Sequence, residues 1–176
     1  MAKLGRSALI HYIDESMGGQ TVSWFKIGKD VEDMSVELNP DTETVKNILD
    51  ETSVNDNGYE PSMSVETYFA DPSDTTFYVA IKNIAMNRIK GDGCKTKILE
   101  VLVDKTTGPF DAWQEDVIVK PTSYGGAQGG VRIPYTVTFN GNRVPGTVSF
   151  GTGGAPTFTP SSGDDGDDGD DGGLGG

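Results

Sequence analysis

The stretch that decides the fold class reads VRIPYTVTFN and runs from Val131 to Asn140. Its apolar residues stand at every second position and alternate with polar residues or proline. Successive side chains of a β-strand point to opposite faces of a sheet, so this pattern predicts a strand with one buried face. A shorter alternation, at Met34, Val36 and Leu38, predicts a second strand of the same kind.

Further strands are predicted by short segments that are rich in branched and aromatic residues and are separated by turn residues. These segments are residues 8–13, 22–27, 63–69, 98–103, 117–119 and 147–150. Asn140-Gly141 favours a tight hairpin turn. Strands that follow one another through short turns favour antiparallel pairing. We therefore expect a mainly β fold, an antiparallel sandwich or barrel.

One segment has a different period. Between Thr75 and Lys90, apolar residues recur at the three-to-four-residue spacing of an α-helix. Asp71 and Asp74 precede this segment and supply capping oxygens, while cations and Gly91 follow it. A single helix that packs its apolar stripe on a sheet is expected here.

A long polar excursion, residues 39–62, separates two predicted strands. Turn signals stand at both of its ends, in Asn39-Pro40-Asp41 and in Asn55-Asp56-Asn57-Gly58. Its middle is compatible with a strand, a short helix or a protruding hairpin. A long polar excursion from a small β-domain is often an interaction element, and an unstructured loop is the alternative.

The composition narrows the range of functions. The chain has 176 residues and a formal net charge of −13. Residues 30–74 hold thirteen acidic residues and one basic residue, Lys46, which argues against a surface that grips nucleic acid through its phosphates. Basic residues cluster further on, at Lys82, Arg88, Lys90, Lys95 and Lys97. The acidic block and the basic cluster could attract each other between copies of the chain, or they could be two separate solvated faces.

The residues that carry chemistry are few. A single histidine, His11, lies in a predicted strand, and a single cysteine, Cys94, is best explained as a small packing residue. Neither nucleophile elbow nor phosphate loop is present in the sequence. We expect no enzyme activity, no catalytic residue, no cofactor and no metal site. No apolar run approaches the roughly 20 residues of a membrane span, which favours a soluble protein made in the cytoplasm.

The C-terminal residues 161–176 repeat Asp-Asp-Gly three times and end in Gly-Leu-Gly-Gly. This segment has no apolar face to bury and repels itself, so a disordered acidic tail is expected after a β domain that spans residues 1–160. Weak calcium binding by the aspartate pairs is an alternative, although the ligand spacing of an EF-hand is missing.

The order of several segments resembles the tail tube, or major tail, proteins of long-tailed (siphovirus-type) bacteriophages. The resemblance covers about residues 22–150. It rests on residues 39–44 (NPDTET) after an alternating strand, residues 58–66 (GYEPSMSVE), the helix end at residues 87–91 (NRIKG) and residues 99–103 (LEVLV). It implies an antiparallel β-sandwich or barrel with one flanking helix and a long protruding loop.

The resemblance also implies a function. Proteins of this family form hexameric rings whose sheets join into an inner β-barrel, and the rings stack into a tube in the virion tail through which DNA passes. The implied partners are copies of the chain itself and other tail proteins, such as the tape measure, tail terminator and distal tail proteins. The loop implied to reach a neighbouring subunit or ring supplies the candidate interface residues. They are Asn39, Asp41, Glu43, Val45, Lys46, Ile48, Leu49, Asp50, Glu51 and Asp56.

Two other functions remain open from the sequence. The tube protein of a contractile injection system would share the fold. A monomeric β-sandwich binding module, with acidic loops that hold calcium, belongs to a different class of protein. A hydrolase is the weakest alternative.

Overall fold

The computed structural model describes residues 2–162. In this range the chain forms eleven strands, one α-helix and three short 3-10 helices. The strands are β1 (Leu9–Asp14), β2 (Trp24–Ile27), β3 (Val36–Glu37), β4 (Pro40–Lys46), β5 (Thr52–Tyr59), β6 (Ser62–Val65), β7 (Lys95–Leu102), β8 (Phe110–Pro121), β9 (Tyr135–Phe139), β10 (Val144–Phe150) and β11 (Pro156–Pro160). The helix is α1 (Phe77–Asn87), and the 3-10 helices are η1 (Arg6–Ala8), η2 (Gly91–Cys94) and η3 (Thr152–Gly154).

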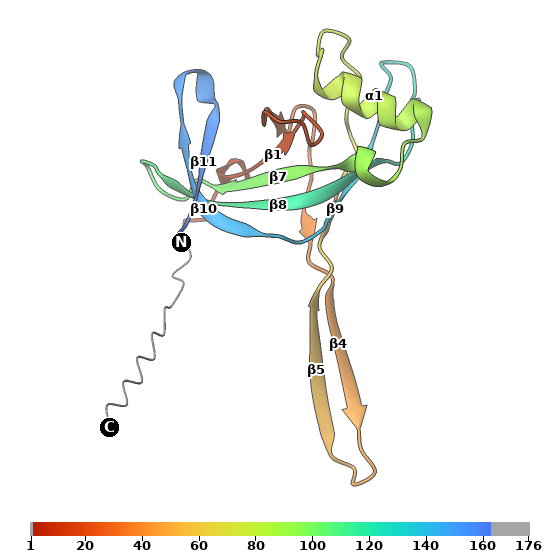
Figure 1. The fold of residues 1–176 in the computed structure, drawn as a ribbon, viewed down its shortest axis with the longest axis vertical. Helices are drawn as coiled ribbons and strands as arrows, with labels where there is room; N and C mark the ends of the chain where they lie inside the picture. Colours follow the sequence, from red (N-terminus) through yellow and green to blue (C-terminus); the bar gives the residue numbers. More distant parts are fainter. Residues whose placement is uncertain (1, 163–176) are drawn as a thin grey trace, which may run out of the picture.

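Nine strands join in one curled antiparallel sheet with the order β2-β1-β7-β8-β9-β6-β3. Strand β10 pairs with β8 and also with β11, so these two strands leave the main path of the sheet. The remaining two strands, β4 and β5, pair only with each other and project away from the body (Figure 1). The predicted mainly antiparallel β fold with one helix and a long protruding element is confirmed.

Both faces of the central strands are buried. On one face, Ile98 packs with the buried side of α1, which presents Phe77, Ile81 and Ala85. The next residue of β7, Leu99, points to the opposite face and packs with Val148 and the aromatic residues near β10 and β11. Because side chains alternate along β7, this one strand contributes residues to two separate clusters of apolar side chains.

The helix begins as its flanking residues predict, but it ends earlier, because Arg88 and not Gly91 is the first left-handed residue after it. The side chain of Asp74 accepts hydrogen bonds from the backbone N–H groups of Thr76 (2.9 Å) and Phe77 (3.1 Å) and so caps the N-terminus. At the other end Arg88 adopts the left-handed conformation, and the N–H of Ile89 bonds to the carbonyl of Ile84. The predicted helix is confirmed, and it is shorter than the apolar pattern by a few residues.

The predicted hairpin at Asn140-Gly141 is wrong. Strands β9 and β10 do not pair; they lie end to end along β8, with Phe139 opposite Val117 and Val144 opposite Gln114. The twelve-residue strand β8 is long enough to pair with both. Gly141 and Asn142, both with positive φ, form an irregularity inside one interrupted strand instead of a reversal of the chain.

Other local predictions are confirmed in part. Ile133, Tyr135, Val137 and Phe139 are buried as the alternation predicts, but Val131 is exposed. Leu38 is also exposed, because β3 ends one residue before it. Cys94 is buried, in agreement with its predicted packing role. The disordered tail was predicted for residues 161–176, and residues 163–176 lie outside the described residues. The domain boundary at residue 160 stays a prediction. Within residues 2–162, no helix is long and apolar enough to cross a lipid bilayer.

Candidate assembly interface

The most distinctive surface feature is the hairpin formed by β4 and β5. Figure 1 shows it at one end of the long axis, opposite the end where α1 lies. At about 3.3 Å per residue, the seven residues of β4 span roughly 23 Å. The predicted excursion is therefore a protruding hairpin, which was one of the three structures that its sequence allowed.

The base of this hairpin is fixed by Asn39. Its side-chain amide donates to the carbonyl of Glu60 (3.0 Å) and to the hydroxyl of Ser62 (3.3 Å). Asn39 has a φ of 45°, a left-handed conformation that asparagine tolerates better than most residues. The N–H of Glu60 bonds back to the carbonyl of Leu38 (3.1 Å). These bonds hold the two strands together where they leave the sheet.

The shaft of the hairpin, which consists of the paired strands β4 and β5, contains a bulge near its base. Asp41 pairs with Gly58, but Thr42 pairs with Asp56, so Asn57 is the extra residue. Gly58 has a φ of 96° and its N–H bonds to the carboxylate of Asp56 (2.9 Å). Because most side chains disfavour this φ, glycine is the suitable residue here. The bulge bends the shaft at a defined place.

The tip is ordered by Asn47. Its side-chain oxygen accepts from the N–H groups of Leu49 (2.9 Å) and Glu51 (3.1 Å), and its amide donates to the carboxylate of Glu51 (2.7 Å). Lys46 and Asp50 form an ion pair at 2.9 Å. The turn therefore has a definite shape although all of its side chains face solvent.

This ordered tip presents two large apolar side chains to water. Ile48 is fully exposed and Leu49 is 72% exposed. Val54 and Tyr59 add exposed apolar area on β5. Exposed apolar side chains that gather at one place are candidates for an interaction surface.

All ten candidate residues are exposed, and the structure places nine of them on the hairpin. Strand alternation puts Asp41, Glu43 and Val45 on one face and Lys46 and Asp56 on the other. Ile48, Leu49, Asp50 and Glu51 form the tip. Asn39 is different, because it anchors the base through its side chain.

Val54 and Tyr59 are not among the ten candidate residues, although the alternation of Val54 with polar neighbours is a usable signal. The outer face of α1, where Val79 and Met86 are exposed, is also outside that set. Helical periodicity identifies the buried stripe, and it says nothing about what covers the opposite face.

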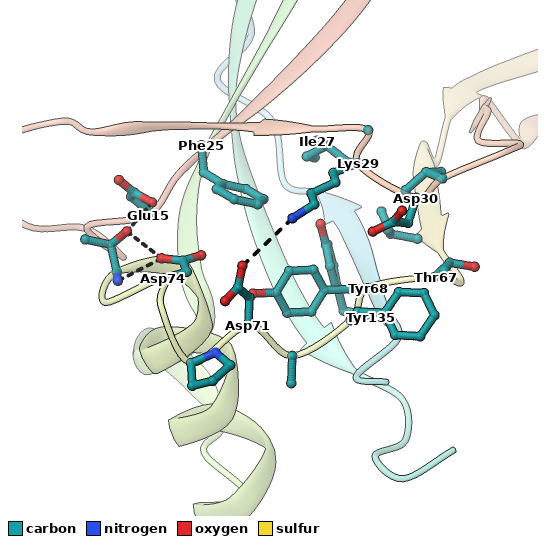
Figure 2. A pocket seen from close by; sticks show the side chains of 17 residues that line it. Glu15, Phe25, Ile27, Lys29, Asp30, Thr67, Tyr68, Asp71, Asp74 and Tyr135 are labelled. Atoms are coloured by element: carbon teal, nitrogen blue, oxygen red, sulfur yellow. Dashed lines mark hydrogen bonds and ion pairs between the residues drawn. The ribbon is translucent and has the colours of Figure 1, made fainter. Parts of the chain in front are cut away.

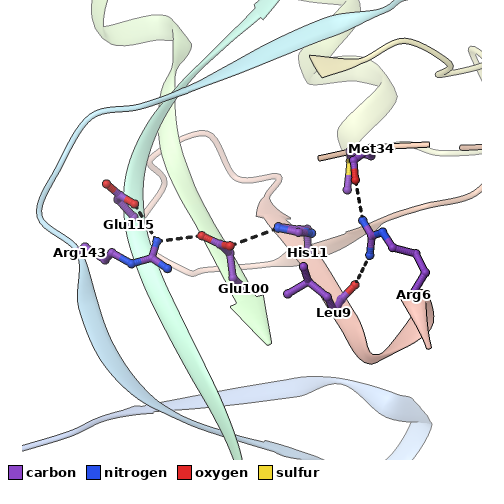
Figure 3. Close-up of polar contacts among 7 residues, drawn as sticks. All are labelled: Arg6, Leu9, His11, Met34, Glu100, Glu115 and Arg143. Atoms are coloured by element: carbon purple, nitrogen blue, oxygen red, sulfur yellow. Dashed lines mark hydrogen bonds and ion pairs between the residues drawn. The ribbon is translucent and has the colours of Figure 1, made fainter. Parts of the chain in front are cut away.

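The body of the molecule contains a row of polar side chains, in which His11, Glu100 and Glu115 are buried and Arg143 is partly exposed (Figure 3). Arg143 bonds to Glu100 at 2.8 Å and to Glu115 at 2.9 Å, and His11 Nε2 lies 3.3 Å from the other oxygen of Glu100. Burial raises the pKa of Glu100, but hydrogen bonds from His11 and Arg143 outweigh it and hold that pKa below its ordinary value. The guanidinium of Arg143 also lies over the ring of Trp113. The ring of His11 is almost fully buried, and within the described residues its Nδ1 has no hydrogen-bond partner.

We predict that Arg143→Met destabilises the fold by about 1–2 kcal/mol, because two nearly buried carboxylates lose a cation that is itself 42% exposed to solvent. The ionised form of Glu100 is favoured in the folded chain, so its contribution is complete above the ordinary pKa of 4.5 and is lost as the pH falls through the lower folded value. The loss of stability caused by the substitution should therefore shrink in acid. Urea unfolding at several pH values measures this, with the exposed Arg132→Met as the control; equal effects of the two variants would contradict the prediction.

A cavity of about 440 Å³ lies between β2 and the loop before α1 (Figure 2). Phe25, Tyr68 and Tyr135 form its aromatic wall, and Asp71 at its edge lies 3.8 Å from Lys29. Burial raises the pKa of both tyrosines, so they stay protonated. Within residues 2–162 no group of His, Cys, Asp or Glu side chains is arranged to hold a metal ion.

No protein-family model matches the sequence, and no curated protein matches it. Two solved structures are similar to the fold. One is the SPP1 tail tube, with 14% sequence identity over 81% of this chain and 78% of that chain and a TM-score of 0.54. The other is the sheath/tube terminator of PVC, an extracellular contractile injection system, with 12% identity over 82% of this chain and 97% of that chain and a TM-score of 0.50.

At these identities the likeness is one of fold. The fold resemblance to a tail tube protein, which the sequence implies, is confirmed. The structural similarity also extends to a terminator from a contractile machine. The candidate interface residues stay a prediction, because the structure describes one isolated chain.

Proposed function

We propose that this chain is a structural subunit that polymerises into stacked rings, hexameric as the family resemblance implies, and forms the tail tube of a bacteriophage. The observation that carries the proposal is the protruding, hydrogen-bonded hairpin with a fully exposed Ile48 at its tip, on a fold similar to the SPP1 tail tube. The proposed role is structural and requires no catalytic residue or cofactor.

The edges of the sheet support self-assembly. Strands β2 and β3 end the sheet order, and the paired strands of the β4–β5 hairpin have no other strand partner within residues 2–162. Unpaired edges are a liability in a monomer because they template pairing with another chain. In a ring such edges are covered by neighbouring copies.

The ten candidate residues form the proposed interface. The hairpin residues Asp41, Glu43, Val45, Lys46, Ile48, Leu49, Asp50, Glu51 and Asp56 would contact a neighbouring subunit or ring, and Asn39 would hold the hairpin at its working angle. Proposed partners beyond the chain itself are a tape measure, a tail terminator and a distal tail protein. The acidic surplus suits a bore that repels DNA phosphates and lets DNA pass. The proposed location is the virion tail, after synthesis in the host cytoplasm.

The second candidate function is a tube terminator of a contractile injection system, favoured by the structural match that covers 97% of that terminator chain. The two functions differ in how assembly ends. A tube subunit should pellet above a critical concentration as polymers of varied length. A terminator should stop at one ring size at every concentration. Sedimentation velocity over a concentration series separates them, and one discrete oligomer at all concentrations would contradict the tube assignment.

We predict that Ile48→Ser combined with Leu49→Ser leaves the melting temperature unchanged but raises the critical concentration for assembly at least about tenfold. Both side chains are exposed in the single chain, so the fold loses little, whereas burying each at an interface contributes about 1.5–3 kcal/mol. Pelleting at increasing concentration measures this. The control is Val131→Ser, another exposed apolar residue that lies away from the hairpin and from the edge strands β2 and β3. Equal assembly of both variants would remove the tip from the interface.

A further inference from the structure

We propose that the outer face of α1 receives the hairpin tip of a second copy of the chain, in a head-to-tail contact. This inference rests on the proposed function, because it names the surface that the hairpin meets. The receiving face consists of Val79, Lys82, Asn83 and Met86 together with the basic residues Arg88 and Lys90 just after the helix.

The receiving face carries two exposed apolar side chains among its polar residues. Phe77, Ile81, Ile84 and Ala85 are buried against the sheet. On the opposite side Val79 is 45% exposed and Met86 is 51% exposed, seven residues apart and so on one side of the helix. They line a shallow groove of about 330 Å³. Methionine adapts its shape to irregular partners, which suits a docking surface.

The charge of the receiving face is positive. The helix contains no acidic residue, and Lys82, Arg88 and Lys90 are exposed. None of these three cations has a salt bridge within the described residues 2–162. Lys82 instead lies 5.2 Å from the centre of the Tyr78 ring on its own helix. The cations therefore remain available to an acidic partner.

The hairpin has the complementary properties. Ile48 and Leu49 supply apolar side chains of a size that a shallow groove accepts, and Asp50 and Glu51 follow them directly. The strands of the shaft add Asp41, Glu43 and Asp56 against a single cation, Lys46. Charge complementarity of this kind steers association and fixes the register of the contact.

The positions of the two surfaces favour a contact between copies. Figure 1 places the hairpin tip and α1 at opposite ends of the long axis, so the tip cannot reach the helix of its own chain. A contact that joins two different surfaces repeats from copy to copy, and it builds an open stack when the rotation between copies does not close into a ring. The two ends of such a stack differ, because one end presents hairpins and the other presents the outer faces of α1.

The cavity beside Tyr68 is a poorer receptor for the same tip. Its edge carries Glu15, Asp30, Asp71 and Asp74 against one lysine, Lys29, which already pairs with Asp71. An acidic tip would meet like charges there. The receiving face on α1 combines exposed apolar groups with cations that form no salt bridge within residues 2–162. This combination favours the receiving face over the cavity as the site that binds the tip.

Charge reversal with rescue tests the proposal. We expect Lys82→Glu with Lys90→Glu, and separately Asp50→Lys with Glu51→Lys, to reduce the pelleted fraction at least about tenfold without changing the melting temperature. The tip reversal also removes the Lys46–Asp50 ion pair and the Asn47–Glu51 hydrogen bond. A chain that carries all four substitutions should regain most of the assembly, because the opposite charges meet again. No rescue in that chain would contradict the charge pairing. Lys3→Glu with Lys105→Glu is the control for the helix reversal, since both lysines are exposed and the two double variants change the net charge by the same amount.

A disulfide test gives an independent answer. Ile48→Cys with Val79→Cys should form a ladder of intermolecular disulfides under oxidation, while the native Cys94 is buried. Ile48→Cys with Val131→Cys, another exposed position, is the control and should give none. If wild type assembles but the helix reversal has no effect and no ladder forms, this inference is wrong and the proposed function stands. A wild type that never assembles overturns both.

Discussion

Replacing residues 45–53 by Asn-Gly is expected to give a folded subunit that no longer polymerises. The replacement joins Thr44 to Val54, which are paired in the hairpin, and Asn-Gly suits a two-residue turn between paired strands. It removes Ile48, Leu49 and the acidic residues of the tip together. The body keeps its core, because every residue removed is exposed.

The expected size of this effect is a loss of all pelleted protein at concentrations where wild type forms polymers, with a melting temperature within about 2 °C of wild type. A second variant keeps the length and replaces the same nine positions by Gly and Ser. It should fail as well if the chemistry of the tip matters, and assemble if only the reach of the hairpin matters. Tubes formed by the shortened chain would show that the hairpin is not the assembly element.

Ile81→Asp is expected to unfold the subunit. Ile81 is among the most deeply buried side chains and packs between α1 and the sheet in the same cluster as Phe77. A carboxylate at this position would be buried without a cation or hydrogen-bond donor, which costs about 4 kcal/mol or more. For a domain of this size that lowers the melting temperature by about 10 °C or prevents folding.

The matched control is Val79→Asp, the same type of change two residues earlier on the exposed side of the helix. Its melting temperature should stay within about 2 °C of wild type. Circular dichroism and thermal melts of the isolated subunit measure both. A cooperative melt of Ile81→Asp at the wild-type temperature would mean that α1 does not pack on the sheet.

The parts of the fold that the sequence predicted are those set by local patterns. The period of α1 and the cap at Asp74 depend on residues within one or two turns of the helix. The buried positions of β9 follow from simple alternation. Pairing over long distances is different. Asn140-Gly141 interrupts a strand and does not form a hairpin, because β8 is long enough to pair with both β9 and β10. The residues around Asn140 carry no local signal of this pairing.

The candidate site was predictable in place and only partly in form. Turn residues and acidic composition marked residues 39–62 as an excursion, but a strand, a helix and a hairpin all remained compatible. The choice of a hairpin depends on Asn39 holding Glu60 and on the turn around Asn47, which are contacts between residues far apart or in particular conformations. The receiving face on α1 could not be predicted, because exposure of Val79 and Met86 is known only once the buried side of the helix is fixed.

The most direct test of the proposed function is negative-stain electron microscopy of the purified full-length protein at high concentration. The proposal predicts rings and long hollow tubes of uniform width, with a regular repeat along the axis where rings stack. Single small particles at every concentration, with sedimentation velocity that shows only a monomer, would contradict it and favour a monomeric binding module instead.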